Sequence, residues 1–294
     1  MVCRFDTVII IGCGKIADDI LSYVADLQSH YGYKTKYIEH EVNHLSRMKA
    51  ICDKRKIDFA RILDKCTLAE TLCAMEERTL IVSAGNNYIF PQPIIEKANV
   101  EIINFHNALL PKLPGRNATT WAIYLEEPAS GATWHYVTEE IDNGLIISQR
   151  QTQLTEDIKA YELSKNIMQL AYEAFQGFFD RLLQEHISGT DLRVDAKKRK
   201  IYYSYEIPEN GVCTLNMPGS QIYRLLRATD YGKNDIFPPI KMILNTNNVV
   251  KISRYKKVYR EHCTEKQKWM NYEDEQCVYT WLDEVYELKL SYKK

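Results

Sequence analysis

The 294-residue sequence contains no long hydrophobic run. No apolar stretch approaches the roughly 20 residues needed to cross a bilayer, and the strongest one, Val8–Ile11, has the length of a strand. The first residues lead directly into that strand and leave no room for the hydrophobic part of a secretory signal. We therefore expect a cytoplasmic protein without a membrane segment.

An excess of charge is also missing. Lys and Arg total 38 and Asp and Glu total 39, which gives a net charge of −1. Proteins that bind many phosphates usually carry a basic face, and here only the run 197–200 is basic. That run is typical of a solvated linker, with a phosphate-facing patch as the alternative. The balance disfavours a nucleic acid as partner.

Paired cysteines at short spacing are absent as well. The eight cysteines form no Cys-x-x-Cys pair and no Cys/His cluster with zinc spacing. Without a secretory signal we expect reduced thiols rather than a disulfide framework, and no metal site.

Strand and helix patterns alternate regularly in the first half of the sequence. At 294 residues and 45% hydrophobic composition, two domains are expected. Short β-branched runs predict strands at 7–11, 34–38, 59–63, 80–83 and 100–104, and helical spacing appears at 15–28, 45–55, 69–77 and 93–98. The alternation predicts an α/β fold, with a Rossmann-like, mostly parallel sheet covered on both faces.

The pattern changes in the second half of the chain. A long helix is predicted over 161–184, followed by polar residues and then by Tyr- and Val-rich runs at 201–205, 241–244, 249–252 and 286–290, with one helix at 220–228. We predict a catalytic domain over 1–190, a linker over 191–200 and a smaller, mostly β domain over 201–294. An OB-like form is left open for that domain.

The glycine-rich turn at 12–17 is a first candidate site. Its sequence, Gly-Cys-Gly-Lys-Ile-Ala, fits the G-x-G-x-x-A pattern that receives a dinucleotide phosphate at a helix N-terminus, and Glu39 stands where a ribose could bind. A tight first turn is needed in any doubly wound fold, so a purely structural turn is the alternative.

A second cluster carries more specific chemistry. Asn104 and His106 lie two apart at the end of a predicted strand, so their side chains are expected on one side of it. The carboxyl ends of parallel strands are where open α/β sheets bind ligands. Asp142 follows a strand-like stretch and stands in a turn that ends at Gly144.

These three residue types suffice for acyl transfer to an amine. A histidine can accept the proton of the amine near neutral pH. An asparagine amide can donate to the oxyanion of a tetrahedral intermediate. An aspartate can orient the histidine or relay a proton. The structural alternative is a capping Asn104, a core His106 and an ordinary turn at Asp142.

The stretch resembles the formyltransferase family that uses 10-formyltetrahydrofolate. The family's Asn-x-His followed by Leu-Leu-Pro matches Asn104, His106 and 109–111, and its Asp-x-Gly-x-Ile-Ile matches 142–147. Residues 205–211 and 222–228 resemble the domain that follows in methionyl-tRNA formyltransferase. The resemblance implies formyl transfer by Asn104, His106 and Asp142, without a metal. It also implies a folate site at Ser83, Gly85, Tyr88, Ile89, Phe90, Val137, Thr138, Glu140 and Ile141.

The acceptor is less well defined by the resemblance. The stretches 116–123 and 133–137 are similar to formylating domains of peptide-antibiotic and siderophore assembly, and sugar-nucleotide enzymes share the core motif. We expect a small or carrier-bound amine, with acceptor contacts at Gly12, Lys15, Arg116, Asn117 and His135. Methionyl-tRNA formylation, hydrolysis of the formyl donor and a nicotinamide-dependent oxidoreductase remain alternatives, and a homodimer is left open.

Overall fold

The computed structural model describes residues 2–40, 48–245, 248–259, 267–272, 275–281 and 286–293. Contact clustering divides the chain into two compact units. Unit 1 comprises residues 1–118, 129–153 and 165–202, and unit 2 comprises residues 119–128, 154–164 and 203–294.

Unit 1 is built on a seven-stranded sheet with the order β3-β2-β1-β4-β5-β6-β7. Its strands are β1 (Thr7–Gly12), β2 (Lys34–Glu39), β3 (Asp58–Arg61), β4 (Thr79–Ala84), β5 (Val100–His106), β6 (Ala129–Tyr136) and β7 (Ile146–Gln153). Strands β1 to β5 pair in parallel, while β6 and β7 pair antiparallel at one edge. The predicted α/β class with a mostly parallel sheet is confirmed.

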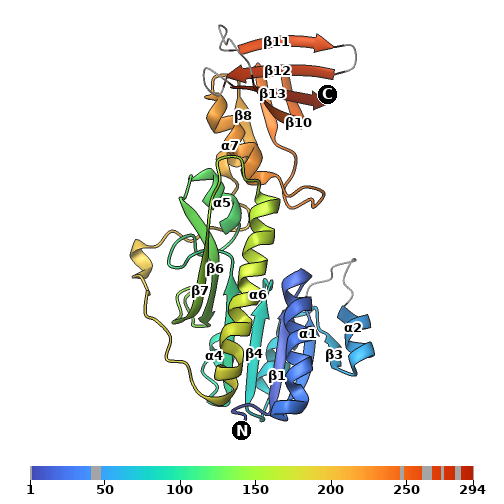
Figure 1. Ribbon diagram of the computed structural model, residues 1–294, viewed down its shortest axis with the longest axis vertical. Coiled ribbons are helices and arrows are strands. Elements are labelled where there is room, and N and C mark those ends of the chain that lie inside the picture. The colour runs from blue at the N-terminus through green and yellow to red at the C-terminus, as the bar shows by residue number, and fades with distance from the viewer. Residues whose placement is uncertain are drawn as a thin grey trace. The chain divides into compact units, whose positions relative to one another are not determined.

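Helices cover both faces of this sheet (Figure 1). They are α1 (Gly14–Tyr31), α2 (Met48–Arg55), α3 (Lys65–Cys73), α4 (Gln92–Ile95) and α6 (Ala160–Gln184), whereas α5 (Ala118–Tyr124) belongs to unit 2 except for its first residue. In α1 the residues Ile16, Ile20 and Val24 recur at helical spacing and are buried, because they form the stripe that faces the sheet. Helix α1 ends at Gly32, whose φ of +80° suits glycine.

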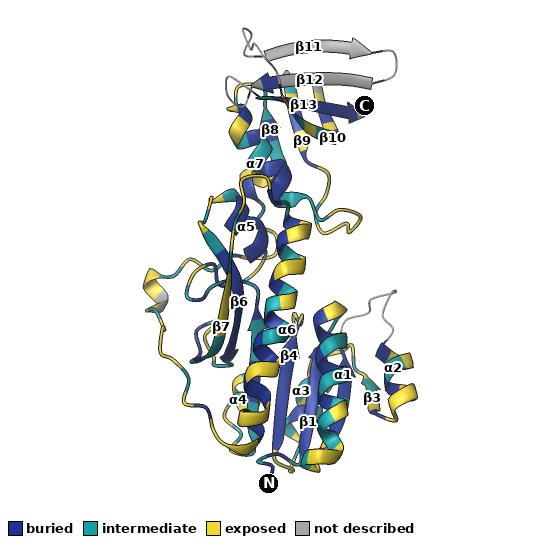
Figure 2. Ribbon diagram, in the orientation of Figure 1, coloured by how far each residue is buried: buried dark blue, intermediate teal, exposed yellow. Residues whose placement is uncertain are grey.

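The core of unit 1 lies between these helices and the sheet. Figure 2 shows β1 and β4 buried along their length, whereas α1 and α6 expose their outer faces. Residues of α3 and α4 pack on the face of the sheet that carries Ile9, Ile11 and Ile81. Tyr23 of α1 contacts Phe175 of α6 edge to face, with 6.2 Å between ring centroids.

Unit 2 contains a smaller sheet with the order β11-β12-β13-β10-β9-β8. Its elements are β8 (Val212–Thr214), α7 (Gly219–Thr229), β9 (Lys241–Asn245), β10 (Asn248–Tyr259), β11 (Gln267–Tyr272), β12 (Glu275–Trp281) and β13 (Tyr286–Lys293), and short 3-10 turns occur at Ala196–Lys198 and Pro208–Gly211. Leu225 of α7 packs against Leu288 and Leu290 of β13. A mostly β C-terminal part is thereby confirmed, while the OB-like form and the division at 190–200 stay predictions.

Two local expectations were wrong. The run 201–205 does not form a strand, because only Tyr202 makes an isolated bridge, to Gly115. The basic run 197–200 is not fully solvated, because the side chain of Arg199 is only 3% exposed. Part of the helix predicted over 45–55 lies outside the described residues.

Candidate active site

Strand β5 and its antiparallel neighbour β6 bring the first site residues together. Asn104 and His106 lie near the end of β5, and Asn104 stands opposite His135 in the register with β6. The amide nitrogen Nδ2 of Asn104 lies 3.2 Å from Nε2 of His135. The side chain of His135 therefore points toward the predicted site.

The loop between β6 and β7 adds the carboxylate of Asp142. Its Oδ2 lies 3.3 Å from Nδ1 of His106, and its Oδ1 lies 3.5 Å from Nε2 of His135. The backbone N–H of Gly115 donates to Oδ2 at 2.7 Å. The structure thus gathers Asn104, His106 and Asp142, the residues singled out from the sequence, around one point, together with His135.

A directional series of hydrogen bonds fixes the amide of Asn104. The hydroxyl of Ser83 donates to Oδ1 of Asn104 at 2.7 Å, so the amino group of Asn104 faces His135. His135 can accept at Nε2 because its Nδ1 lies 2.8 Å from the carbonyl oxygen of Tyr136 and donates to it. One N–H of Asn104 is used in this way, which leaves the other for a ligand.

Burial and charge set the protonation of the pair formed by His106 and Asp142. Burial lowers the pKa of His106, and the carboxylate of Asp142 opposes that shift. Burial alone would raise the pKa of Asp142, but its interactions with His106 and His135 and the hydrogen bond from the N–H of Gly115 outweigh burial, so the pKa is lowered. Asp142 is therefore an anion at neutral pH.

Gly144 is required by the close approach of the loop to β6. A β-carbon at Gly144 would lie 1.7 Å from the carbonyl oxygen of Tyr136. Only glycine allows this approach, which explains the Asp-x-Gly spacing that places Asp142 beside His106.

The two segments predicted to hold a folate flank this cluster. In the first, Ser83 lies in β4 and Gly85 directly follows that strand, Tyr88 and Phe90 are buried against the sheet, and Ile89 is 69% exposed.

The second segment continues β6 beyond its last residue. The N–H of Val137 donates to Ile102, and the hydroxyl of Thr138 donates to the carbonyl of Glu140. The carbonyl of Ile141 accepts from Arg199. A pocket of about 590 Å³ borders this loop and is lined by Thr138, Glu139, Glu140, Asn143, Asp191, Arg193, Val194 and Asp195. Its carboxylates and carbonyls suit the amino and ring N–H donors of a pteridine.

The predicted acceptor residues are less tightly grouped. Arg116 is exposed, and its backbone N–H donates to Tyr202 at 2.7 Å. Asn117 adopts φ +59° and precedes α5. Lys15 forms an exposed ion pair with Asp19 one turn along α1.

The glycine-rich turn at 12–17 packs closely on β4. A β-carbon at Gly12 would lie 1.8 Å from the carbonyl oxygen of Ala84, so the turn needs glycine for packing. Glu39, the expected ribose ligand, is 2% exposed and pairs with Arg61 at 2.5 Å. Its carboxylate is therefore already engaged, which favours the structural interpretation of this turn.

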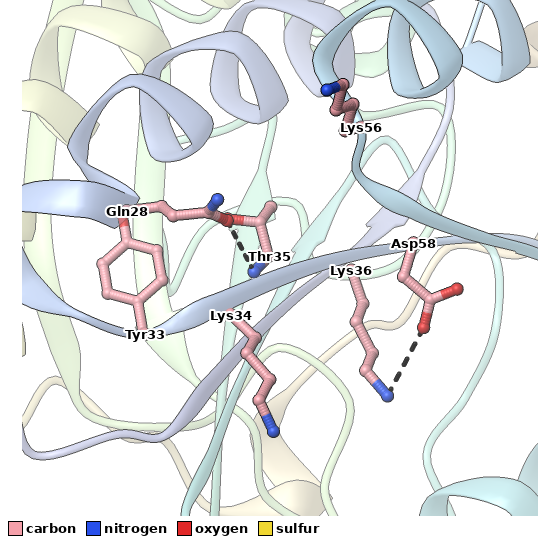
Figure 3. Close-up of a pocket in the computed structure, with 7 residues that line it drawn as sticks. All are labelled: Gln28, Tyr33, Lys34, Thr35, Lys36, Lys56 and Asp58. Carbon is pink, nitrogen blue, oxygen red and sulfur yellow. Dashed lines mark hydrogen bonds and ion pairs between the residues drawn. The ribbon is translucent and has the colours of Figure 1, made fainter.

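A separate pocket lies at the start of β2 and β3 (Figure 3). Its basic residues Lys34 and Lys36 pair with Glu77 and Asp58. None of the predicted site residues lines it.

In the described part of the chain, no helix has the length and apolar character of a membrane span, and no group of His, Cys, Asp and Glu side chains is placed to hold a metal ion. The cysteines at positions 3, 13, 52, 66, 73 and 213 form no disulfide there, and Cys263 lies outside the described residues.

Two features of the site carried no signal in the sequence. Arg199 was placed in a linker, yet its guanidinium contacts the loop that carries Asp142. The hydrogen bond from Ser83 to Asn104 depends on the pairing of β4 with β5. The pairing of neighbouring strands brings Ser83 and Asn104 together, and no spacing of residues within either strand indicates that contact.

Comparison with known proteins supports the resemblance. A domain model described as "Formyl transferase" matches residues 47–177. The bifunctional polymyxin resistance protein ArnA of Wigglesworthia glossinidia brevipalpis is 26% identical over 214 residues, covering 73% of this chain and 31% of that protein. Methionyl-tRNA formyltransferase of Clostridioides difficile (strain 630) is 33% identical over 106 residues, covering 36% of this chain and 34% of that protein. The matches span about a third of the length of these two relatives.

A solved structure extends the likeness to the whole fold. The N-formyltransferase of Helicobacter canadensis, in complex with folinic acid and dTDP-3-aminofucose, matches with a TM-score of 0.69 and 16% identity. The match covers 99% of this chain and 100% of that one. These findings confirm the resemblance seen in the motifs: residues 47–177 carry a formyl transferase domain.

Proposed function

We propose that the protein is an N-formyltransferase that moves the formyl group of 10-formyltetrahydrofolate to a primary amine. The observation that carries this proposal is the cluster in which Asp142 lies 3.3 Å from His106 and Asn104 presents an amide N–H beside them. The family match over residues 47–177 supports the same reaction.

Each residue of the cluster has a proposed task. When bound, the folate supplies an activated formyl carbon, which the unprotonated amine attacks. The remaining N–H of Asn104 donates to the oxyanion that develops, a kind of contact worth about 3–4 kcal/mol in other enzymes. In its protonated form, His106 stabilises the negative charge of the same oxyanion. Asp142 holds the imidazole and helps to move the proton released by the amine to the folate nitrogen that carried the formyl group. The bond between that nitrogen and the formyl carbon breaks, and tetrahydrofolate leaves.

We propose an amino sugar linked to a nucleotide as the acceptor. The N-formyltransferase of Helicobacter canadensis, which is similar over its whole length, was solved with dTDP-3-aminofucose. The net charge of −1 disfavours a tRNA acceptor. A carrier-bound peptide amine is the second candidate, on the similarity of residues 116–123 to peptide-formylating domains.

The test begins with the natural protein and 10-formyltetrahydrofolate. We expect a gain of one formyl group on a dTDP-linked amino sugar, read by mass spectrometry of the product. Formylation of a carrier-bound amine or of methionyl-tRNA alone would reject the sugar acceptor. Formate release without any amine would identify a hydrolase, and turnover with a reduced nicotinamide but not with the folate would reject formyl transfer.

Variants of the cluster then test the assigned roles. We expect His106→Ala and Asp142→Asn each to lower kcat by at least about a hundredfold, because each removes a group that acts in the transition state. Binding of a folate analogue should persist, since its proposed contacts lie mainly in the flanking segments. Exposed residues away from the predicted site provide the controls His186→Ala and Asp53→Asn, which should retain full activity. Near wild-type turnover by either site variant would refute the assignment.

A further inference from the structure

The segment that follows α6 returns to the active site. Thr190 and Ile146 exchange two backbone hydrogen bonds, of 2.7 and 2.9 Å. The side-chain amide of Asn143 bonds to both the N–H and the carbonyl of Val194, each at 3.2 Å. The segment is thus attached at two points to the residues that directly follow Asp142.

A second attachment lies beyond Arg199. The N–H of Tyr202 donates to Pro114 at 3.0 Å, and the N–H of Arg116 donates to Tyr202 at 2.7 Å. Gly115 lies between these two bonds and itself donates to the carboxylate of Asp142. Arg199 is therefore held between two fixed points, each of which contacts the surroundings of Asp142.

Arg199 contacts the backbone on both sides of the Asp142 α-carbon. Its Nη2 donates to the carbonyl of Ile141 at 2.5 Å and to the carbonyl of Asp142 at 3.0 Å. Its Nη1 lies 3.8 Å from the carboxylate of Glu140, and its side chain is 3% exposed. Charge-assisted bonds of this kind are strong when they are buried.

Asp142 needs such support because its backbone is strained. Its φ is +50°, in the left-handed region that non-glycine residues rarely occupy. A residue in that region keeps its conformation only where its surroundings hold it there. The two carbonyls bound by Arg199 belong to the peptide planes before and after Asp142, which are the planes that define its conformation.

We propose that Arg199 is a positioning residue that keeps the carboxylate of Asp142 against His106. The proposal rests on the proposed function only for its effect on turnover, because the geometry of the pair can be measured without substrate. Removing an outer partner that orients a functional residue typically lowers activity by roughly 10- to 100-fold.

The first test measures the titration of His106 by NMR in the protein without ligands. The carboxylate of Asp142 raises the pKa of His106, while His135 and Arg116 lower it. If Arg199→Met releases the carboxylate, His106 should titrate at a lower pH than in the natural protein, as it should in Asp142→Asn. The matched control is Lys198→Met, the exposed neighbour in the same basic run. His106 in the Lys198→Met variant should titrate at the same pH as in the natural protein.

The second test measures turnover. Arg199→Met should lower kcat by roughly 10- to 100-fold with a smaller change in KM. Arg199→Lys keeps the charge but not the planar guanidinium, so its kcat should lie between those of the natural protein and Arg199→Met. If Arg199→Met does not fold, Arg199→Lys must still lower the pKa of His106. An unchanged His106 titration in a folded Arg199 variant would overturn the proposal. A shifted titration in a protein that never transfers formyl would instead uphold the positioning role and reject the proposed function.

Discussion

Both ring nitrogens of His106 face oxygen acceptors. Nε2 lies 2.9 Å from the carbonyl oxygen of Leu113, and Nδ1 lies 3.3 Å from Asp142. A neutral imidazole carries one N–H and can satisfy only one of these acceptors, whereas the cation satisfies both. Burial favours the neutral form. The proton on His106 is therefore held in a balance between charge and desolvation, which suits a group that must gain and lose a proton during turnover.

The lowered pKa of His106 predicts how stability depends on pH. Between its folded pKa and the unfolded value of 6.5, the unfolded chain binds more protons, so the free energy of unfolding falls as the pH falls. His106→Gln removes this contribution. Between about pH 7.5 and 5.5 the free energy of unfolding of the variant should fall less than that of the natural protein, measured by urea unfolding.

Asp142 serves as an internal reference for this measurement. The pKa of Asp142 is lowered from 3.8, so its stabilisation is present above that value and is lost only in more acidic solution. If the free energy of unfolding depends on pH equally in His106→Gln and in the natural protein, His106 has the same pKa in the folded and unfolded states.

The sequence predicted the site residues that share a strand or a motif and missed those that meet through the tertiary structure. Asn104 and His106 were predicted to share one side because they lie two apart on a strand. Asp142 was predicted from its Asp-x-Gly motif. Arg199 stands 57 residues from Asp142 along the chain, and only the return of the segment after α6 brings its guanidinium to that carbonyl. No pattern in the basic run distinguishes Arg199 from its exposed neighbours.

At the scale of elements, β6 connects the core to the active site. Adjacent residues of a strand point to opposite faces, so His135 faces Asn104 while Trp134 faces α6. The indole N–H of Trp134 donates to the carbonyl of Ala171 at 2.8 Å, and its ring contacts Phe175 with centroids 5.1 Å apart. The packing of Trp134 thereby fixes the strand that carries His135.

Trp134→Phe tests this link. The change leaves the carbonyl of Ala171 without its buried donor and opens a small cavity beside Phe175. We expect a loss of about 1–3 kcal/mol in the free energy of unfolding, measured in urea. A folded variant with the stability of the natural protein would show that neither the hydrogen bond nor the indole volume anchors α6 to β6.

Element prediction succeeded where the hydrophobic pattern was long and regular. The helix predicted over 161–184 was found as Ala160–Gln184, because its apolar stripe runs through six turns. The strand expected after the turn at Gly144 was found as β7, although its residues 148–153 are polar and it forms an edge of the sheet. The run 201–205 has strand composition, but only Tyr202 forms a β-bridge, and its backbone bonds are with the loop at Pro114 and Arg116.

At the scale of the whole molecule, the two units are interleaved along the chain. Unit 2 takes in residues 119–128 and 154–164 besides the C-terminal part, and α6 begins in unit 2 and continues in unit 1. The predicted boundary at 190–200 came from a change in composition. Short segments inserted from another unit leave the composition around them unchanged, so the sequence offered no sign of them.

A chain that ends at Tyr202 tests where the structural boundary lies. The shortened chain keeps residues 119–128 and 154–164 but loses their partners within unit 2. Thr120 loses the hydroxyl of Tyr231 at 3.0 Å, and the carbonyl of Ile158 loses the guanidinium of Arg227 at 2.9 Å. We expect a lower melting temperature, with the first protease cuts in these two segments, because their buried polar groups become exposed to water. If the chain 1–202 instead melts like the natural protein and resists cleavage there, the first domain is complete without unit 2. The boundary at 190–200 would then describe the folding units better than the spatial division does.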